Sequence, residues 1–160
     1  MKILVAAASK HGSTAEIADA IARQLATAGH EVDVREPELV RALDGVEVVV
    51  LGSAVYAGHW LKEAREFSER LAPDLATRPV WLFSSGPIGN PATPAEESVD
   101  AAVALETTGA REHRTFAGRI DKEKLSFGER AIVRALHAAV GDFRDWDEIA
   151  EWTRSIEASL

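Results

Sequence analysis

The sequence predicts an α/β fold, a three-layer sandwich in which a five-stranded parallel sheet carries helices on both faces. Short, mostly apolar runs alternate along the chain with longer segments of helical periodicity. This alternation is typical of right-handed β-α-β units, which make the strands parallel. Near-continuous apolar strands are expected where helices cover both faces of a sheet. Five strands within 160 residues favour a doubly wound sheet with the strand order 2-1-3-4-5.

The first half of the chain contains three predicted strands and two predicted helices. The strands are predicted over Lys2–Ala8, Glu31–Arg35 and Val46–Leu51. A helix is predicted over Ser13–Ala28, because apolar residues recur there at helical spacing and Gly29 follows as a C-terminal stop. The second helix is expected to end at Pro73, and its apolar face comprises Trp60, Leu61, Ala64, Phe67, Ser68 and Leu71.

The second half supplies the remaining two strands and three helices. The strands are predicted over Pro79–Phe83 and Ala110–Phe116. The helices are predicted over Ala95–Leu105, Leu125–Val140 and Trp146–Leu160, and we expect Asp145 or Asp147 to cap the last of them. Neither an internal repeat nor a linker interrupts this pattern, so residues 1–160 are predicted to form a single domain.

Composition excludes several classes of function. The chain has no cysteine, which excludes disulfides, zinc–thiolate sites, iron–sulfur clusters and cysteine nucleophiles, and we expect no bound metal. With 26 acidic and 18 basic residues the net charge is −8, which disfavours nucleic acid as a partner. No apolar run approaches the roughly 18 residues of a membrane-spanning helix, and the apolar start is predicted to be a strand rather than a secretory signal. These features predict a cytoplasmic protein.

Three unusual loops follow the first, third and fourth predicted strands, where such a sheet binds its ligand. In the first loop, backbone amides around Gly12 and the start of a helix could hold a phosphate, although an ordinary Ser/Thr N-cap explains the residues equally well. The sequence lacks the phosphate-binding motifs of Walker and dinucleotide sites and the G-x-S-x-G of serine hydrolases. The predicted third strand ends in Gly52-Ser53, which excludes a response regulator, because that class needs a phospho-accepting aspartate at this position.

The second and third loops are rich in glycine and contain no Asp or Glu over residues 52–60 and 84–93. Trp60 is expected to belong to the core. Tyr56 is the only tyrosine of the chain. We expect its ring to face the ligand-binding crevice at the strand ends, rather than to be half-buried with a purely structural role. His59 is the best candidate for acid–base chemistry, and no catalytic residue is assigned. In residues 84–91, two glycines and two prolines could hold backbone groups against a planar ligand.

The segments S-K-H-G-S-T, G-S-A-V-Y-A-G-H-W and F-R-D-W resemble the flavodoxin-like superfamily, and within it the menaquinone-dependent protoporphyrinogen dehydrogenase branch. The similarity covers essentially the whole chain. It implies that FMN is the cofactor and that its phosphate is held by Ser9, Lys10, His11, Gly12, Ser13 and Thr14. It implies that the isoalloxazine ring is flanked by Ser53, Ala54, Val55, Tyr56, Ala57 and Gly58, and by Ser84, Ser85, Gly86, Pro87, Ile88 and Gly89.

The resemblance implies an FMN oxidoreductase of heme biosynthesis that passes electrons from a porphyrinogen to a quinone. The alternative is a one-electron carrier whose partner is a redox protein, and the acidic composition slightly favours it. A binding domain without flavin is a third hypothesis, which the first loop disfavours. The sequence departs from carriers in the third loop, which offers Pro87 and Ile88 where carriers usually place an aromatic residue.

Residues 111–134 form a basic segment in this acidic chain. They contain seven Lys and Arg against four Asp and Glu, with apolar residues interleaved. A solvated helix face explains this pattern and is the favoured interpretation. The other is peripheral contact with anionic lipid at the inner face of the membrane.

Overall fold

Five parallel strands form the central sheet of the computed structural model, which describes residues 1–86, 98–135 and 141–160. The strands are β1 (Lys2–Ala8), β2 (Glu31–Arg35), β3 (Val48–Tyr56), β5 (Val80–Ser85) and β6 (Glu112–Phe116). Their order is β2-β1-β3-β5-β6, which confirms the predicted order 2-1-3-4-5 of parallel strands. A short strand, β4 (His59–Trp60), pairs antiparallel with the end of β3.

The register of the sheet places the ends of β1 and β5 level with Ser53 and Ala54 of β3, which continues to Tyr56. Ala8 pairs with Ser53, and Ser53 pairs with Ser84. The central strands are apolar and buried on both faces because helices cover both sides. The three loops picked out in the sequence therefore start side by side.

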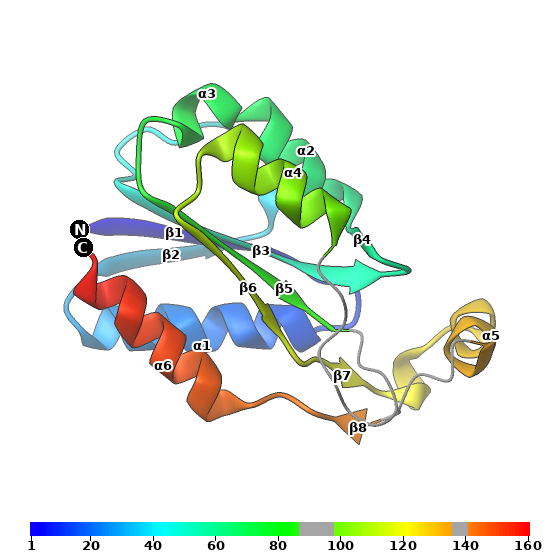
Figure 1. Cartoon of the computed structure of the whole chain (residues 1–160). Helices are drawn as coiled ribbons and strands as arrows, with labels where there is room; N and C mark the ends of the chain where they lie inside the picture. Colours follow the sequence, from blue (N-terminus) through cyan, green and yellow to red (C-terminus); the bar gives the residue numbers. More distant parts are fainter. Residues whose placement is uncertain (87–97, 136–140) are drawn as a thin grey trace.

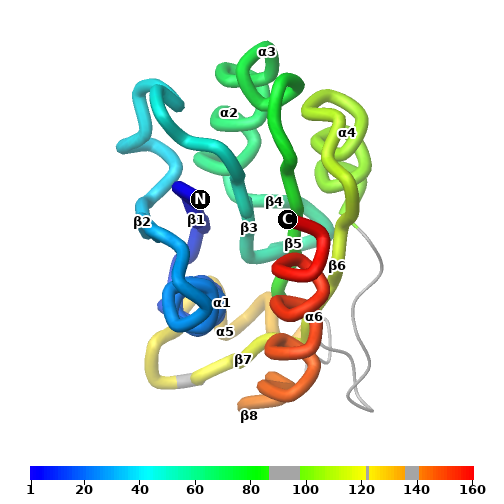
Figure 2. Tube along the Cα trace, turned by 90° about the vertical axis from the view of Figure 1, so that its left-hand side faces the viewer, coloured from blue at the N-terminus to red at the C-terminus, as the bar shows by residue number. Residues whose placement is uncertain are grey.

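Helices cover the two faces of the sheet, as Figures 1 and 2 show. One face carries α1 (Ser13–Thr27) and α6 (Trp146–Ala158), and their apolar residues pack on β1, β3 and β5. The other face carries α2 (Lys62–Arg70), α3 (Ala72–Leu75) and α4 (Val99–Thr108), and a 3-10 turn, η1 (Pro37–Leu39), packs beside α2. No helix within the described residues is both long and apolar enough to cross a membrane.

Gly52 on β3 is required by close packing in the first of these layers. A Cβ atom at Gly52 would lie 2.1 Å from the ring of Phe83. That ring packs against Phe116 and Trp152 in tilted and edge-on contacts, with centroid distances of 6.1 Å in both cases. Gly52, in the middle of β3, thus makes room for the aromatic core between the sheet and helices α1 and α6.

Several element boundaries differ from the predicted ones. The third strand runs on to Tyr56, and Trp60 belongs to β4 rather than to the following helix. Leu61 is extended, so α2 begins at Lys62, and Pro73 lies in the first turn of α3 instead of closing a helix, because a first turn needs no N–H there. Helix α4 begins after its N-cap Ser98, and the predicted start at Ala95 lies outside the described residues.

An insertion between β6 and α6 extends beyond the ligand-binding edge of the sheet (Figure 1). It contains β7 (Arg119–Ile120), η2 (Lys122–Lys124), α5 (Phe127–Ala135) and β8 (Gly141–Asp142), and β7 pairs antiparallel with β8. The sequence predicted one helix over Leu125–Val140 here. The described helix begins two residues later, and residues 136–140 lie outside the described part.

Candidate functional site

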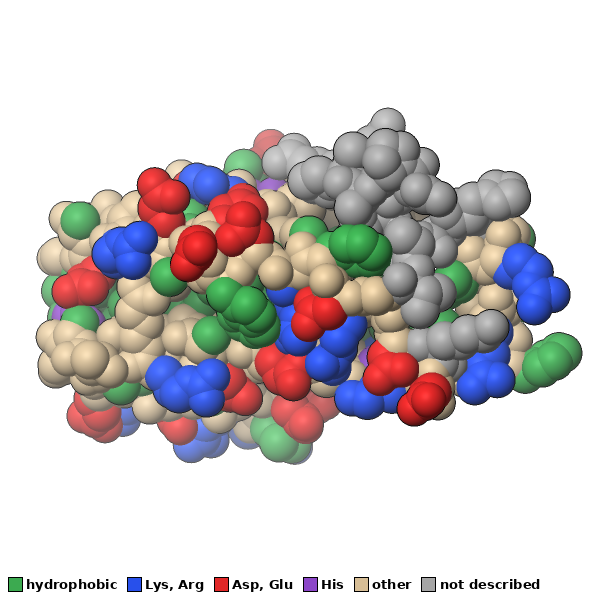
Figure 3. All heavy atoms as spheres, turned by 90° about the horizontal axis from the view of Figure 1, so that it is seen from below, with side chains coloured by type: hydrophobic (Ala, Val, Ile, Leu, Met, Phe, Trp, Pro, Cys, Tyr) green, Lys and Arg blue, Asp and Glu red, His purple; other side chains and the backbone are tan. Residues whose placement is uncertain are grey.

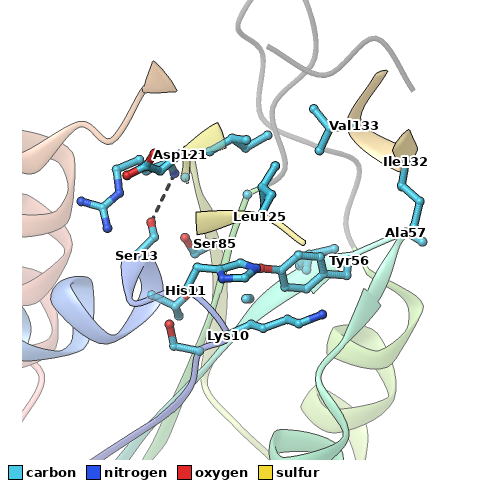
Figure 4. A pocket seen from close by; sticks show the side chains of 18 residues that line it. Lys10, His11, Ser13, Tyr56, Ala57, Ser85, Asp121, Leu125, Ile132 and Val133 are labelled. Atoms are coloured by element: carbon cyan, nitrogen blue, oxygen red, sulfur yellow. Dashed lines mark hydrogen bonds between the residues drawn. The ribbon is translucent and has the colours of Figure 1, made fainter. Parts of the chain in front are cut away.

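A pocket opens at the edge of the sheet between the first loop, the end of β3 and the insertion (Figure 4). The first loop contributes Ser9, Lys10, His11, Ser13 and Thr14 to its lining. The sheet contributes Ala54, Val55, Tyr56, Ala57, Ser85 and Gly86. Segments far apart in sequence therefore meet around one cavity, as the fold class predicts for its ligand site.

The start of α1 offers the pocket hydrogen-bond donors. The N-cap position is Gly12, with a left-handed φ of 90°, and its N–H donates to Ser9 Oγ at 3.1 Å. In the described part of the chain no side chain caps this helix, so the ordinary Ser/Thr cap is absent. Uncapped amides at a helix start attract an anion, and the positive end of the helix dipole adds to this attraction. This geometry fits a phosphate group.

Three ionisable side chains meet beside the first loop. Glu129 of α5 places its Oε2 atom 2.7 Å from His11 Nε2 and 3.2 Å from Lys10 Nζ. The hydrogen bond from His11, helped by others from Ser126 and Lys10, lowers the pKa of Glu129 to about 2. Glu129 is therefore ionised at neutral pH, and this carboxylate lies next to the proposed phosphate loop.

Tyr56 lies in the same cluster. Its ring meets the His11 ring edge-on at 6.4 Å between centroids, and Lys10 Nζ lies 5.6 Å from the Tyr56 centroid. Figure 4 shows the three side chains converging at one end of the pocket. Burial, together with the nearby Glu129 carboxylate, raises the pKa of the Tyr56 phenol to about 12. The expectation that this ring faces the crevice agrees with its place in the pocket lining.

His59 lies elsewhere. It is absent from the lining of this pocket, and its side chain is 66% exposed. His59 Nδ1 lies 3.0 Å from Asp100 Oδ2, and the same oxygen accepts a hydrogen bond from the backbone N–H of Trp60. This contact directs His59 toward the start of α4, and His59 stays a candidate that the described pocket lining does not include.

Other predicted site residues have structural contacts. Ser53 and Ser84 are buried, and Trp60 Nε1 donates to Ser84 Oγ at 2.8 Å. Ser53 Oγ accepts from the N–H of Leu61 at 3.0 Å. Neither serine nor Gly58 lines the pocket. The predicted residues Pro87, Ile88 and Gly89 lie outside the described residues.

The insertion supplies pocket residues that the sequence did not reveal. Its contribution to the lining is Gly118, Arg119, Ile120, Asp121, Leu125, Ile132 and Val133. The apolar residues among these form a wall that the sequence signalled only as apolar positions within a basic segment. Residues 52–60 and 84–93 contain no Asp or Glu, but the insertion adds Asp121 to the pocket lining and places Glu129 beside the first loop.

Arg144 of the F-R-D-W element ties the insertion to α1. Its guanidinium donates to both carboxylate oxygens of Asp142, at 2.9 and 2.7 Å, and to Glu16 at 2.7 Å. These contacts lower the pKa values of both carboxyl groups. Asp145 caps α6 by accepting from the N–H groups of Asp147 and Glu148, which confirms the predicted cap. The motif is therefore explained by structural contacts.

Comparison with known proteins identifies relatives of this chain. The model of the flavodoxin domain family matches residues 4–147. Flavodoxin 2 from Bacillus cereus superposes with a TM-score of 0.69 at 25% identity, covering the whole of both chains. A flavodoxin from Streptococcus pneumoniae TIGR4 gives 0.68 at 21% identity, again over both whole chains. Two-electron reduced flavodoxin from Megasphaera elsdenii gives 0.60 at 26% identity over 72% of this chain and 85% of its own. No curated protein matches.

The pKa of Tyr56 is directly measurable, because it is the only tyrosine of the chain. We expect an alkaline absorbance titration to show phenolate formation with a midpoint near 12. The variant Glu129→Gln lowers this midpoint because a neighbouring negative charge is removed, whereas Glu123→Gln, at an exposed position of the same insertion, leaves it unchanged. Circular dichroism at each pH checks that the protein stays folded. A midpoint at the ordinary value of roughly 10 would contradict this environment.

Proposed function

The chain belongs to the flavodoxin domain family and binds FMN, and we propose that it is an oxidoreductase acting on small organic molecules. In this proposal the reaction is similar to that of protoporphyrinogen dehydrogenases of heme biosynthesis. A porphyrinogen donates the electrons and a quinone accepts them. FMN supplies the redox chemistry when bound, and the protein supplies position and electrostatic environment.

The residues of the pocket fit the two ends of the cofactor. The uncapped start of α1, together with Lys10 and His11, offers the hydrogen bonds and positive charge that a phosphate needs. Val55 and Tyr56 offer apolar and aromatic surface for a flat ring at the end of β3. We propose that the residues of the first loop hold the phosphate and that the pocket residues of β3 and β5 flank the ring.

The apolar wall of the insertion is the observation that carries the enzyme proposal. Tyr56 lines the pocket from the end of β3, and Leu125, Ile132 and Val133 line it from the insertion, on the opposite side. A flavin that gives electrons to a protein works best with its edge open to that partner. A wall of aliphatic side chains instead suits a small, flat, apolar molecule that enters beside the ring and displaces water.

A one-electron carrier is the second candidate, and it has observations of its own. The net charge is −8, and acidic proteins associate rapidly with basic redox partners. The solved relatives named above are all described as flavodoxins. Against this, the face of α1 and α6 mixes acidic and basic side chains instead of presenting one sign of charge (Figure 3). The partner in this case is a redox protein.

Rapid mixing distinguishes the two candidates. FMN-loaded protein, reduced by light under anaerobic conditions, is mixed with a menaquinone analogue or with a basic cytochrome. We expect the quinone to reoxidise the protein faster, and Ile132→Ser to slow this reaction about three- to tenfold through lost apolar contact. Val103→Ser is the matched control, because Val103 on α4 is 52% exposed and Ile132 is 55% exposed. The donor side is tested by anaerobic mixing of oxidised protein with protoporphyrinogen.

The opposite ranking decides for the carrier. If the cytochrome reoxidises the protein rapidly and the quinone does not, the oxidoreductase proposal fails. If Ile132→Ser and Val103→Ser slow the quinone reaction equally, the insertion wall has no part in binding the quinone.

Peripheral membrane contact is a separate proposal about the basic segment 111–134. Phe127 is 90% exposed at the start of α5, in a segment of positive net charge, which supports contact with anionic lipid at the inner membrane face. We expect the protein to sediment with phosphatidylserine vesicles at low salt, to be released at high salt, and to bind less after Phe127→Ser. Neutral phosphatidylcholine vesicles are the control. Absence from the anionic pellet at low salt would leave the solvated helix face as the explanation.

A further inference from the structure

The carboxylate of Glu129 contacts two side chains of the first loop, the ammonium group of Lys10 and the imidazole of His11. Its Oε2 atom contacts both His11 Nε2, at 2.7 Å, and Lys10 Nζ, at 3.2 Å. The side chains of Glu129 and His11 are 16% and 21% exposed, whereas that of Lys10 is 50% exposed, so the contact with His11 is the more shielded from water. Residues 11 and 129 are far apart in the sequence, so the contact fixes where the insertion lies.

The other oxygen of Glu129 has a local role. Glu129 Oε1 accepts from the N–H of Ser126 at 3.2 Å, and Ser126 Oγ accepts from the N–H of Glu129 at the same distance. This reciprocal pair is a capping box, which stabilises the first turn of α5. One side chain therefore both starts the helix and anchors it to the first loop.

Little apolar packing holds α5 in place. None of its residues is buried, and Phe127 projects into solvent. We name residues 121–135, which precede and include α5, the strap. Because its hydrophobic contacts are few, polar contacts such as the one made by Glu129 contribute a large share of what keeps the strap at the pocket.

A phosphate group and the Glu129 carboxylate would compete for the same two partners, Lys10 and His11. Lys10 and His11 belong to the loop that precedes the uncapped start of α1. Two anions close together in a partly buried site repel each other, so the second one binds only if the first moves or is neutralised. The carboxylate thus already binds Lys10 and His11, two of the groups that a phosphate ligand would use.

We propose that Glu129 is an internal anion that latches the strap onto Lys10 and His11, and that the phosphate of FMN displaces it. Cofactor loading then loosens the strap without removing it, so that a substrate can enter between the ring and the aliphatic side chains of Leu125, Ile132 and Val133. This inference rests on the FMN site of the proposed function. The two contacts are linked, because a change that weakens the contact of Glu129 with Lys10 and His11 raises the fraction of protein free to bind phosphate, and so tightens phosphate binding by at most the same factor.

The variant Glu129→Gln tests the latch. Glutamine serves in a capping box as well as glutamate does, so α5 keeps its first turn while the charge is lost. We expect the apo-protein variant to bind FMN about tenfold more tightly than the wild type, and inorganic phosphate with a gain in the same direction. Hydrogen exchange of the strap should be faster in the variant without ligand. In the wild type it should become faster when FMN is added.

Two controls separate the latch from other effects. Glu123→Gln removes the same charge from an exposed position of the strap, and it should behave as the wild type in both measurements. Ser126→Ala removes the capping box but keeps the carboxylate, so it should speed exchange of the strap without the full gain in FMN affinity. Riboflavin, which has no phosphate, should not speed exchange of the strap in the wild type.

Unchanged or weaker FMN binding by Glu129→Gln would overturn the latch, as would strap exchange in the wild type that FMN leaves unchanged or slows. In both cases FMN still binds, so the cofactor site stands while the latch fails. If neither the wild type nor the variant binds FMN, the cofactor site itself is wrong and the latch fails with it.

Discussion

The register of β1, β3 and β5 at one edge of the sheet is the constraint on which the site depends. Because Ala8, Ser53 and Ser84 are in register, the first loop, the end of β3 and the end of β5 open onto the same space. The start of α1 lies at this edge with no side-chain cap in the described residues. Its unsatisfied amides make the edge a site for an anion, and the flat, apolar surface beyond them can then receive the ring attached to that anion.

The sequence was sufficient to predict the parts of the molecule that follow from local pattern. Apolar strands and helical spacing predicted the parallel sheet and its order, and Trp60 was correctly assigned to the core and Asp145 to a helix cap. The loops at the strand ends were found because chain connectivity alone places them together. Boundaries such as the start of α2 were missed, because the extended backbone of Leu61 depends on the pairing of Trp60 with Val55 in β4.

The insertion could not be placed from the sequence. Its position depends on contacts between distant residues, such as Glu129 with His11 and Arg144 with Glu16, and no local spacing indicates them. In the sequence its apolar residues appear only as positions scattered through the basic segment 111–134, and this pattern does not predict that they line a pocket. The two loops contain no Asp or Glu, whereas the folded chain brings Asp121 into the pocket and Glu129 beside it. The choice between an enzyme and a carrier therefore depends on the insertion, whose placement the sequence does not predict.

The central claim is that the uncapped start of α1, with the first loop, is the site of the FMN phosphate. Comparing the affinity of the apo-protein for FMN and for riboflavin by fluorescence quenching tests it most directly, because the two ligands share the ring and differ in the phosphate. We expect FMN to bind on the order of 100-fold more tightly, since charge-assisted hydrogen bonds to the loop add about 2.7 kcal/mol in total. Ser13→Glu should abolish this difference by repelling the phosphate, whereas Thr27→Glu, at the exposed far end of α1, should preserve it. Equal affinities for the two ligands in the wild type would contradict the account.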